Sequence, residues 1–362
     1  MSVYYFVFVL TFLIAWQLSG KADKDYLRSL FIIFLPLFFY GAIRVDFGID
    51  YHTYEELYDE FHGLSISEID KDQHAEVGYQ VLNMIMPTWR SLVILQVCIL
   101  YLAFIVLFKT ALNRKNILLA ICLLFLAGNF SIITPLVTMR NGLANAILML
   151  SFPLIRDRKI LPVAILTLLG GTLHSSLMLY MPLAYLAGRR QALTLGEIKF
   201  FSVILVAVVV LGSSAILKYS LNFMMDNFDR YEHMVEEVSN GPGYATLLAG
   251  SANLTILGII AYVSYINREV MSPGDNCLMR IGMLYLLGVF MGSFGGARWQ
   301  SYFVPFLIIN AANMYSYKWN SKELKIFFYA LIFAYFAYNF FYIWQWNNPR
   351  FYVFQHYHSI FD

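Results

Sequence analysis

Four ionisable residues lie at the ends of long apolar segments of this chain, where a charged group is energetically costly. They are Arg44, Arg140, His174 and Arg298. A charge in such a place commonly marks a substrate path or a water-filled cavity, although a single arginine there also serves to reach lipid head groups. Three arginines on one face of the molecule indicate a shared anion site, because the forked guanidinium suits phosphate or diphosphate oxygens.

The run 44–54 mixes carboxylates with aromatic rings around Gly48, which permits a tight turn. Sugar-binding surfaces use the same mixture, since rings pack on sugar faces and carboxylates accept hydrogen bonds from hydroxyls. An alternative role for Asp50 is to cap a short helix. The residues in this run that we expect to contact a sugar or to do chemistry are Asp46, Asp50, Tyr51 and Tyr54.

Two further short motifs surround the other charged positions. Arg140 stands in Thr138–Ala144, a run that otherwise suits an apolar helix, and His174 stands in Gly170–Ser176. An imidazole at the start of a helix can donate to a phosphate or act as a general base. It can equally be a structural hydrogen-bonding group, so the sequence leaves both roles for His174 open.

The composition indicates an integral membrane protein. Of the 362 residues 59% are hydrophobic and only 13% are charged, whereas soluble domains have roughly a quarter of charged residues, and the mean hydropathy is +0.61. The net charge of +2 gives no polybasic signal for nucleic acid. The three cysteines lie in apolar runs, and we find no HExxH or histidine cluster, so we expect no disulfide framework, metal or cofactor.

Apolar segments recur along the whole chain, and a helix needs about 20 residues to cross a bilayer. We predict an all-α polytopic membrane protein with about twelve spans (10–13), forming a single domain over residues 1–362. The segment 160–172 is a candidate for a broken or re-entrant helix. The predicted spans are 2–19, 29–43, 91–108, 117–136, 141–155, 160–172, 174–187, 199–217, 248–266, 277–293, 301–316 and 326–345.

The distribution of charge predicts the orientation. Most of the 25 basic residues fall in the short connections on one side, which the positive-inside rule assigns to the cytoplasm. Both termini and two long acidic loops, about 44–90 and 218–247, are then on the outer side. The second loop has an amphipathic stretch that ends near Gly241, and we expect it to lie at the outer interface. Long loops often hold function.

Three of these motifs together resemble the EpsG family of exopolysaccharide proteins, which belongs with the Wzy-type polymerases. The first is Arg44 with Gly48-x-Asp50-Tyr51-x-x-Tyr54 in the first outer loop. The second and third are Met139–Ala144 and Leu173–Leu177, while Arg298 in Gly295–Trp299 fits more loosely. Asn141 departs from the pattern, since many members have glutamine there.

The resemblance implies a bacterial inner-membrane glycosyltransferase with a GT-C-like architecture and a site that faces the periplasm. Its donor would be a growing glycan on undecaprenyl diphosphate, and its acceptor a further lipid-linked repeat unit. No nucleotide sugar or metal would be needed, and a chain-length regulator is a candidate partner. The O-antigen ligases use the same donor and are the nearest alternative. A flippase or transporter of lipid-linked sugars, and an acyltransferase built on His174, are alternatives of other classes.

The resemblance implies roles for the candidate residues. Arg140 and Arg298 would stabilise the diphosphate leaving group, and Arg44 would assist them or hold the loop. Asp50 is the preferred general base and His174 the other candidate, with Glu76 or Asp46 as replacements for Asp50. Segment 218–243 would act as a lid over the sugars. The predicted substrate-binding residues are Asp46, Tyr51, Tyr54 and Glu76.

Overall fold

The computed structural model describes residues 2–20, 25–48, 50–69, 75–199, 244–287, 292–345 and 357–360. These residues are mostly helical, with almost no sheet, which confirms the all-α prediction. One short antiparallel pair of strands, β1 (Arg44–Val45) and β2 (His358–Ser359), brings the C-terminal residues beside the start of the first outer loop. The predicted loop 218–247 and its lid, and the segment 199–217, lie essentially outside the described residues.

Most of the described helices follow the predicted apolar segments, but α17 begins at Gly292 instead of residue 301, so that Arg298 lies inside it, and the predicted outer loop holds the helices α3 and α4. In chain order they are α1 (Ser2–Leu18), α2 (Tyr26–Ala42), α3 (Tyr51–Phe61), η2 (Ile66–Glu68), α4 (Val77–Ile85), α5 (Trp89–Ala111), η3 (Arg114–Asn116), α6 (Ile117–Leu126), η4 (Asn129–Ile133), α7 (Thr134–Val137), α8 (Met139–Leu150), α9 (Phe152–Arg156), α10 (Ile160–Leu173), α11 (Leu177–Ala187), α15 (Tyr244–Ile266), α16 (Pro273–Leu287), α17 (Gly292–Met314) and α18 (Lys322–Gln345).

The break in the helical pattern falls at a different place from the one we expected. Segment 160–172 forms the continuous helix α10, whereas 117–136 is bent by 81° between α6 and the π-helical turn η4. The hydroxyl of Ser131 donates to the carbonyl of Leu124 at 2.7 Å, so a side chain satisfies backbone that the bend releases. The chain then turns at Thr138 and begins α8 with Arg140 in its first turn.

One described helix, Trp89–Ala111, has by itself the length and apolar character to cross a membrane, and the bent pair Arg114–Leu126 and Asn129–Val137 does so jointly. Several other apolar helices are shorter, with 10–17 residues. The number of membrane crossings, about twelve from the sequence, therefore stays a prediction.

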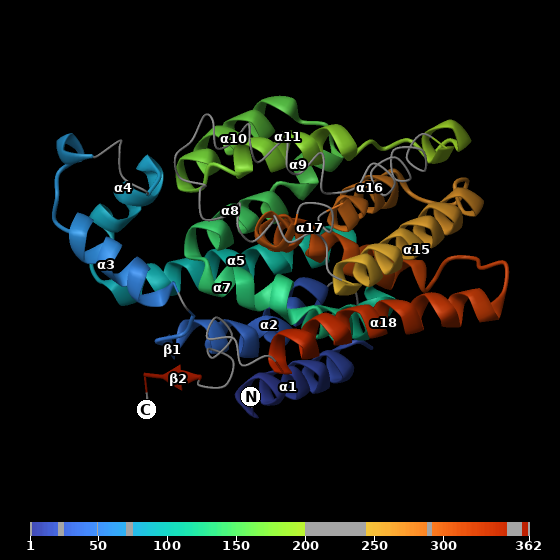
Figure 1. The fold of residues 1–362 in the computed structure, drawn as a ribbon, viewed down its shortest axis with the longest axis horizontal. Coiled ribbons are helices and arrows are strands. Elements are labelled where there is room, and N and C mark those ends of the chain that lie inside the picture. Colours follow the sequence, from blue (N-terminus) through green and yellow to red (C-terminus); the bar gives the residue numbers. More distant parts are fainter. Residues whose placement is uncertain are drawn as a thin grey trace.

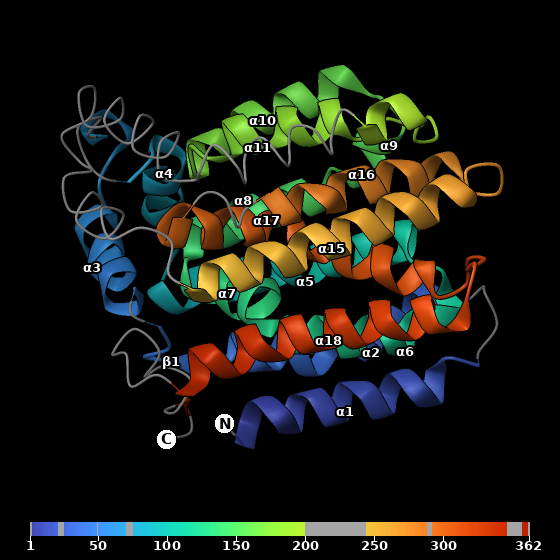
Figure 2. The same cartoon turned by 45° about the vertical axis from the view of Figure 1, so that its right-hand side comes forward.

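The long helices run roughly side by side in layers (Figures 1 and 2). Helices α9, α10 and α11 form one outer layer, α1 lies at the opposite surface next to α2 and α18, and α5, α8 and α17 pass between them. Helices α3 and α4 stand apart at one end of the bundle, near β1 and β2 and near the start of α1 (Figure 1). We call this the α3/α4 end.

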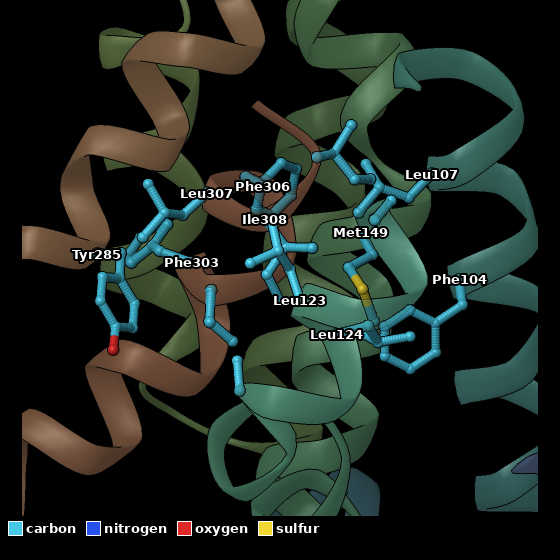
Figure 3. Packing of buried hydrophobic residues seen from close by; sticks show 14 of the residues in the cluster. Phe104, Leu107, Leu123, Leu124, Met149, Tyr285, Phe303, Phe306, Leu307 and Ile308 are labelled. Carbon is cyan, nitrogen blue, oxygen red and sulfur yellow. The ribbon is translucent and has the colours of Figure 1, made fainter. Parts of the chain in front are cut away.

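The bundle is held by one large apolar core through its centre (Figure 3). Side chains of α5, α6, α8, α16 and α17 interlock there, and Phe104, Leu123, Met149 and Phe306 are among those that are completely buried or nearly so. A second cluster holds α3 and α4 against the bundle. It consists of Tyr54, Tyr58, Phe61, Ala75, Tyr79, Leu92, Val93, Met139 and Leu143. The outer loop therefore docks through its own apolar contacts.

Candidate functional site

A cavity of about 180 Å³ opens at the α3/α4 end, between the first outer loop and the ends of three bundle helices. Four of the five residues that we predicted to be catalytic line it, although they are far apart in the sequence. The lining residues are Asp50, Thr53, Tyr54, Thr138, Arg140, Asn141, His174 and Arg298. Arg44 is not among them.

Each charged side chain reaches this cavity from the end of an element. Asp50 is the N-cap residue of α3, Arg140 lies in the first turn of α8, and His174 is the C-cap residue of α10. Gly48 sets the direction of the loop with a φ of +111°, a backbone angle that residues with a Cβ atom rarely adopt. Charges at helix ends avoid burial along apolar helix faces, and here they meet one another.

Glu76 connects two of these residues. One carboxylate oxygen accepts from Arg140 Nη1 at 2.7 Å, and the other lies 3.0 Å from His174 Nδ1. The second oxygen also accepts from the backbone N–H of Ser175 at 3.0 Å and from its hydroxyl at 3.2 Å. Burial raises the pKa of Glu76, but the hydrogen bonds from His174 and Ser175 and the charge of Arg140 outweigh it and lower the pKa to about 2. Glu76 is therefore a carboxylate with both oxygens occupied.

Asp50 is in a different electrostatic environment. Burial raises its pKa above the ordinary value, and the positive charges of Arg298 and Arg140 oppose that rise only in part. Its side chain makes no capping hydrogen bond to α3, although it occupies the N-cap position. The structure therefore gives Asp50 no capping bond and places its carboxyl group among the cavity-lining residues.

Two arginines and an aromatic ring complete the cavity. Arg298 is exposed, and it lines the cavity from the first part of α17. The guanidinium of Arg140 lies 5.9 Å from the ring centre of Tyr54, within the range of a cation–π contact. Tyr54 in turn packs edge-on against Tyr79 at 5.8 Å. An anion in this cavity would meet two guanidinium groups beside an aromatic wall.

Arg44 has a structural role. It is 1% exposed, and its guanidinium donates to the carbonyls of Gly41 at 2.7 Å and Leu136 at 3.1 Å and to the amide oxygen of Gln96 at 2.6 Å. Arg90 donates to the carbonyl of Arg44 at 2.5 Å. From the sequence, Arg44 was expected either to assist the other two arginines or to hold the first outer loop, and these contacts agree with the second role. Both Nη atoms of Arg44 donate to backbone and amide oxygens, and Arg44 is not part of the cavity lining.

Of the four predicted substrate-binding residues, Tyr54 lines the cavity, whereas Glu76, Tyr51 and Asp46 lie outside its lining. The hydroxyl of Tyr51 accepts from Trp89 Nε1 at 3.0 Å, and its buried ring anchors α3 to α5. Asp46 is exposed, and its carboxylate lies 2.8 Å from His52 Nε2. These two residues shape the loop around the cavity.

Thr53 and Thr138 line the cavity but were not singled out from the sequence, whereas Asn141 was noted there as a departure from the family pattern. Thr53 and Thr138 stand inside the motifs that we identified, so their proximity to the charged residues in the sequence was the available signal. The buried side chain of Asn141 donates to Ser301 Oγ at 3.1 Å and joins α8 to α17. Among the described residues no group of three or more His, Cys, Asp and Glu side chains could hold a metal ion.

Comparison with known proteins identifies the family. The sequence matches the EpsG family over residues 27–357, which is nearly the whole chain. The chain belongs to the EpsG family. This family is one of Wzy-type polymerases, and together with the apolar helical fold it indicates a membrane protein of polysaccharide synthesis. No curated protein and no solved structure gave a significant match.

Proposed function

We propose that this EpsG-family protein is a metal-independent, GT-C-like glycosyltransferase that joins undecaprenyl-diphosphate-linked repeat units into a polysaccharide. The observation that supports this most directly is the cavity in which Arg140 and Arg298 lie with Asp50 and His174. It combines a site for an anionic leaving group with two candidate proton acceptors.

The arginines suit the charge that develops during the reaction. As the bond between the sugar and the diphosphate breaks, the sugar becomes oxocarbenium-like and negative charge builds on the departing oxygen. Donors that are already in place stabilise such charge best. Arg140 is held by Glu76 at 2.7 Å, while Arg298 approaches from α17. The two guanidinium groups would bind the diphosphate from different elements.

The rest of the lining suits a sugar. Thr53 and Thr138 offer hydroxyl groups, and the buried ring of Tyr54 offers an apolar surface. A carboxyl group whose pKa is raised, such as that of Asp50, can exchange a proton more readily near neutral pH than an ordinary aspartate. Asp50 and His174 are therefore both placed to take the proton of an acceptor hydroxyl.

The proposed location is the inner membrane of a bacterium, with the α3/α4 end and both termini facing the periplasm. Large apolar side chains point outward on the surface helices, including Trp16, Phe39, Leu168 and Leu179, as expected for contact with lipid. The opposite end carries the basic connections, where Asn267 bonds the backbone of Lys318. The positive-inside rule places that end in the cytoplasm.

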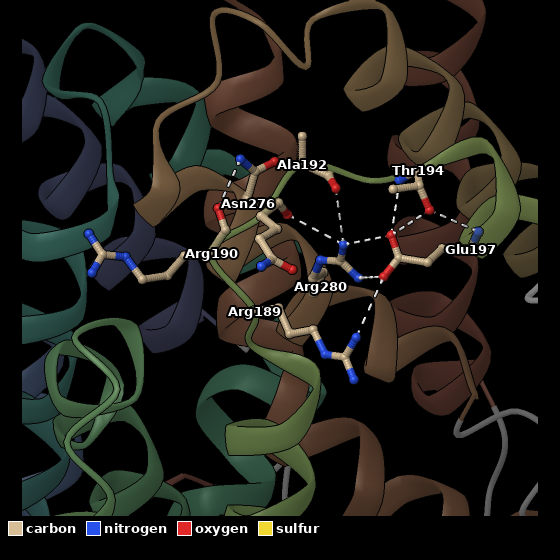
Figure 4. Close-up of polar contacts among 8 residues, drawn as sticks. Arg189, Arg190, Ala192, Thr194, Glu197, Asn276 and Arg280 are labelled. Atoms are coloured by element: carbon tan, nitrogen blue, oxygen red, sulfur yellow. Dashed lines mark hydrogen bonds and ion pairs between the residues drawn. The ribbon is translucent and has the colours of Figure 1, made fainter.

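A transporter of lipid-linked sugars would need cations along a path between the two faces. Arg280 is the cation that stands deepest in a predicted span, and its guanidinium donates to both oxygens of Glu197, at 3.1 Å and 3.0 Å. It also donates to the carbonyl of Ala192 at 3.4 Å (Figure 4). This paired arginine fixes the 188–198 connection to α16 and favours an enzyme over a transporter.

The test is the glycan profile of the native host that carries Arg140→Ala, read as surface polymer length and as the lipid-linked pool. We expect single repeat units and no longer ladder, with the protein still present in the membrane. Arg268→Ala, an exposed arginine that lies 3.7 Å from Glu269, is the control and should leave the ladder unchanged.

Other outcomes of this test would contradict the proposal. A full ladder from Arg140→Ala would rule out the arginine site. Long polymer retained on the lipid carrier would identify a ligase, and repeat units trapped on the cytoplasmic leaflet would identify a flippase.

A further inference from the structure

The contact between Glu76 and His174 fixes which nitrogen of the imidazole carries the hydrogen. Both oxygens of Glu76 can only accept hydrogen bonds, because the carboxylate is ionised and is held by Arg140 and Ser175 as well. Nδ1 of His174, at 3.0 Å from Glu76 Oε1, must therefore be the donor. The neutral imidazole then has its lone pair on Nε2.

Among the described residues, that lone pair has no hydrogen-bond partner. Nε2 of His174 is buried and makes no hydrogen bond to any of the described residues, while the side chain belongs to the cavity lining. A buried acceptor without a donor is costly, commonly about 1–3 kcal/mol. A hydroxyl group of a molecule bound at His174 in the cavity would satisfy this acceptor.

We propose that His174 is the general base of the reaction, through Nε2, and that Glu76 is the positioning residue that sets its tautomer. This proposal rests on the proposed function. It decides between the two bases that the sequence left open, and it gives Glu76 a role that is distinct from sugar binding.

The proposed step is a glycosyl transfer in which His174 removes the proton of the acceptor hydroxyl. The acceptor hydroxyl gives its proton to His174 Nε2 while its oxygen forms a bond to the anomeric carbon of the donor sugar. The bond from that carbon to the diphosphate oxygen breaks, and its electron pair leaves with the diphosphate, which faces Arg140 and Arg298. The imidazolium then returns its proton to the released diphosphate or to water.

The surrounding charges support this direction of transfer. Glu76, the N-cap residue of α4, would be the counter-ion of the imidazolium, while Arg140 on α8 and Arg298 on α17 would bind the diphosphate. Asp50 also lines the cavity. Close to His174 in the chain, the hydroxyl groups of Ser176 and Tyr302 lie 2.9 Å apart. A proton on His174 is thus balanced by Glu76 at the moment when negative charge leaves with the carrier.

The chain provides a matched control pair. His52 Nδ1 lies 3.3 Å from Glu55 Oε2 on α3, so the same two residue types are in contact, but on the exposed surface of the loop. Rates of polymer formation would be measured with the purified full-length protein in proteoliposomes. The substrate is the single lipid-linked repeat unit extracted from a host that lacks this protein.

We expect His174→Asn to lower kcat by about a hundredfold or more with little change in KM, since its amide keeps the contact to Glu76 but offers no base. Glu76→Gln should lower kcat by about ten- to a hundredfold, because the imidazole loses the carboxylate that sets its tautomer. It should also move the acidic limb of the pH–rate profile to lower pH, because a protonated imidazole loses its counter-charge. His52→Asn and Glu55→Gln should keep the wild-type rate and profile.

A wild-type rate for His174→Asn would overturn the proposal, as would an acidic limb that disappears in Asp50→Asn and stays in place in Glu76→Gln. If either variant fails to fold, judged by thermal unfolding of the same preparation, Glu76→Asp decides: an unchanged rate and profile would overturn it. Failure of the wild-type protein to make polymer would instead contradict the proposed function.

Discussion

Arg44 and Arg298 carry the same guanidinium group in opposite environments. Arg44 is buried and gives its hydrogen bonds to Gly41, Leu136 and Gln96, whereas Arg298 is exposed at the cavity. From the sequence both are arginines at the end of an apolar segment. Their surroundings assign the first to the fold and the second to the candidate chemistry.

We therefore expect Arg44→Ala to lower stability and Arg298→Ala to lower activity. Loss of Arg44 leaves buried carbonyls without a donor, at about 1–3 kcal/mol for each, and should lower the thermal unfolding temperature of the purified protein. Arg298→Ala should unfold at the wild-type temperature and yet make shorter polymer. The opposite pattern, with a stable Arg44→Ala protein that is inactive, would return Arg44 to the reaction.

The ion pairs of Glu76 predict a pH dependence of stability. Because its pKa is lowered from 4.5 to about 2 in the folded protein, its contribution is complete above about pH 4.5 and is lost as the pH falls towards 2. The shift corresponds to a contribution on the order of 3 kcal/mol. Between about pH 4.5 and pH 2, the thermal unfolding temperature of the wild type should fall more steeply than that of Glu76→Gln. Parallel curves for the two proteins would contradict this.

At the scale of elements, the docking of α4 against α10 decides whether Glu76 reaches its partners. A Cβ atom at Gly78 would lie 2.2 Å from Oγ1 of Thr172 and 2.8 Å from its carbonyl oxygen, so only glycine permits this approach. Glu76 precedes α4 directly, as its N-cap residue. The position of the carboxylate therefore depends on a backbone contact between an outer-loop helix and a bundle helix.

Gly78→Ala should push α4 away from α10 and reduce polymer length in the host, while the bundle still folds. Gly258→Ala is the matched control, because no atom lies within 4 Å of a Cβ there and alanine is the better helix former. The measurement is the length distribution of the surface glycan at equal protein levels. A wild-type length distribution for Gly78→Ala would contradict this prediction, since it would show that polymer length does not depend on the close contact of α4 with α10.

On the scale of the whole molecule, the two ends of the bundle hold different elements. Helices α3 and α4, the cavity and the β1–β2 pair lie at one end. The opposite end has the connections in which Asn113 bonds Asn313 and Asn116 bonds Ser316. Orientation in the membrane therefore decides which compartment supplies the substrates.

Cysteine labelling tests that orientation. In a variant with Cys98, Cys122 and Cys277 replaced by alanine, Ser67→Cys and His358→Cys should react with a membrane-impermeant maleimide from the periplasmic side. Lys322→Cys, at the start of α18, should react only after the inner membrane is permeabilised. All three positions are exposed, so accessibility to the reagent depends on the side of the membrane. Reversed labelling would move the cavity to the cytoplasm.

The sequence by itself determined the helical character of this protein and the approximate positions of most described apolar helices, because apolar segments of this length have few ways other than helices to satisfy their backbone in lipid. It also singled out Arg140, His174, Arg298 and Asp50, since charges next to such segments are conspicuous. The match over residues 27–357 then confirmed the family to which its short motifs pointed.

Only the tertiary structure decided which of these residues meet. The bend of 81° after α6, the burial of Arg44 and the contacts of Glu76 with Arg140 and His174 all depend on residues far apart in the chain. Sequence patterns report local backbone preference and burial. They do not report distances between elements, and those distances place the carboxylate of Glu76 on Arg140 and His174.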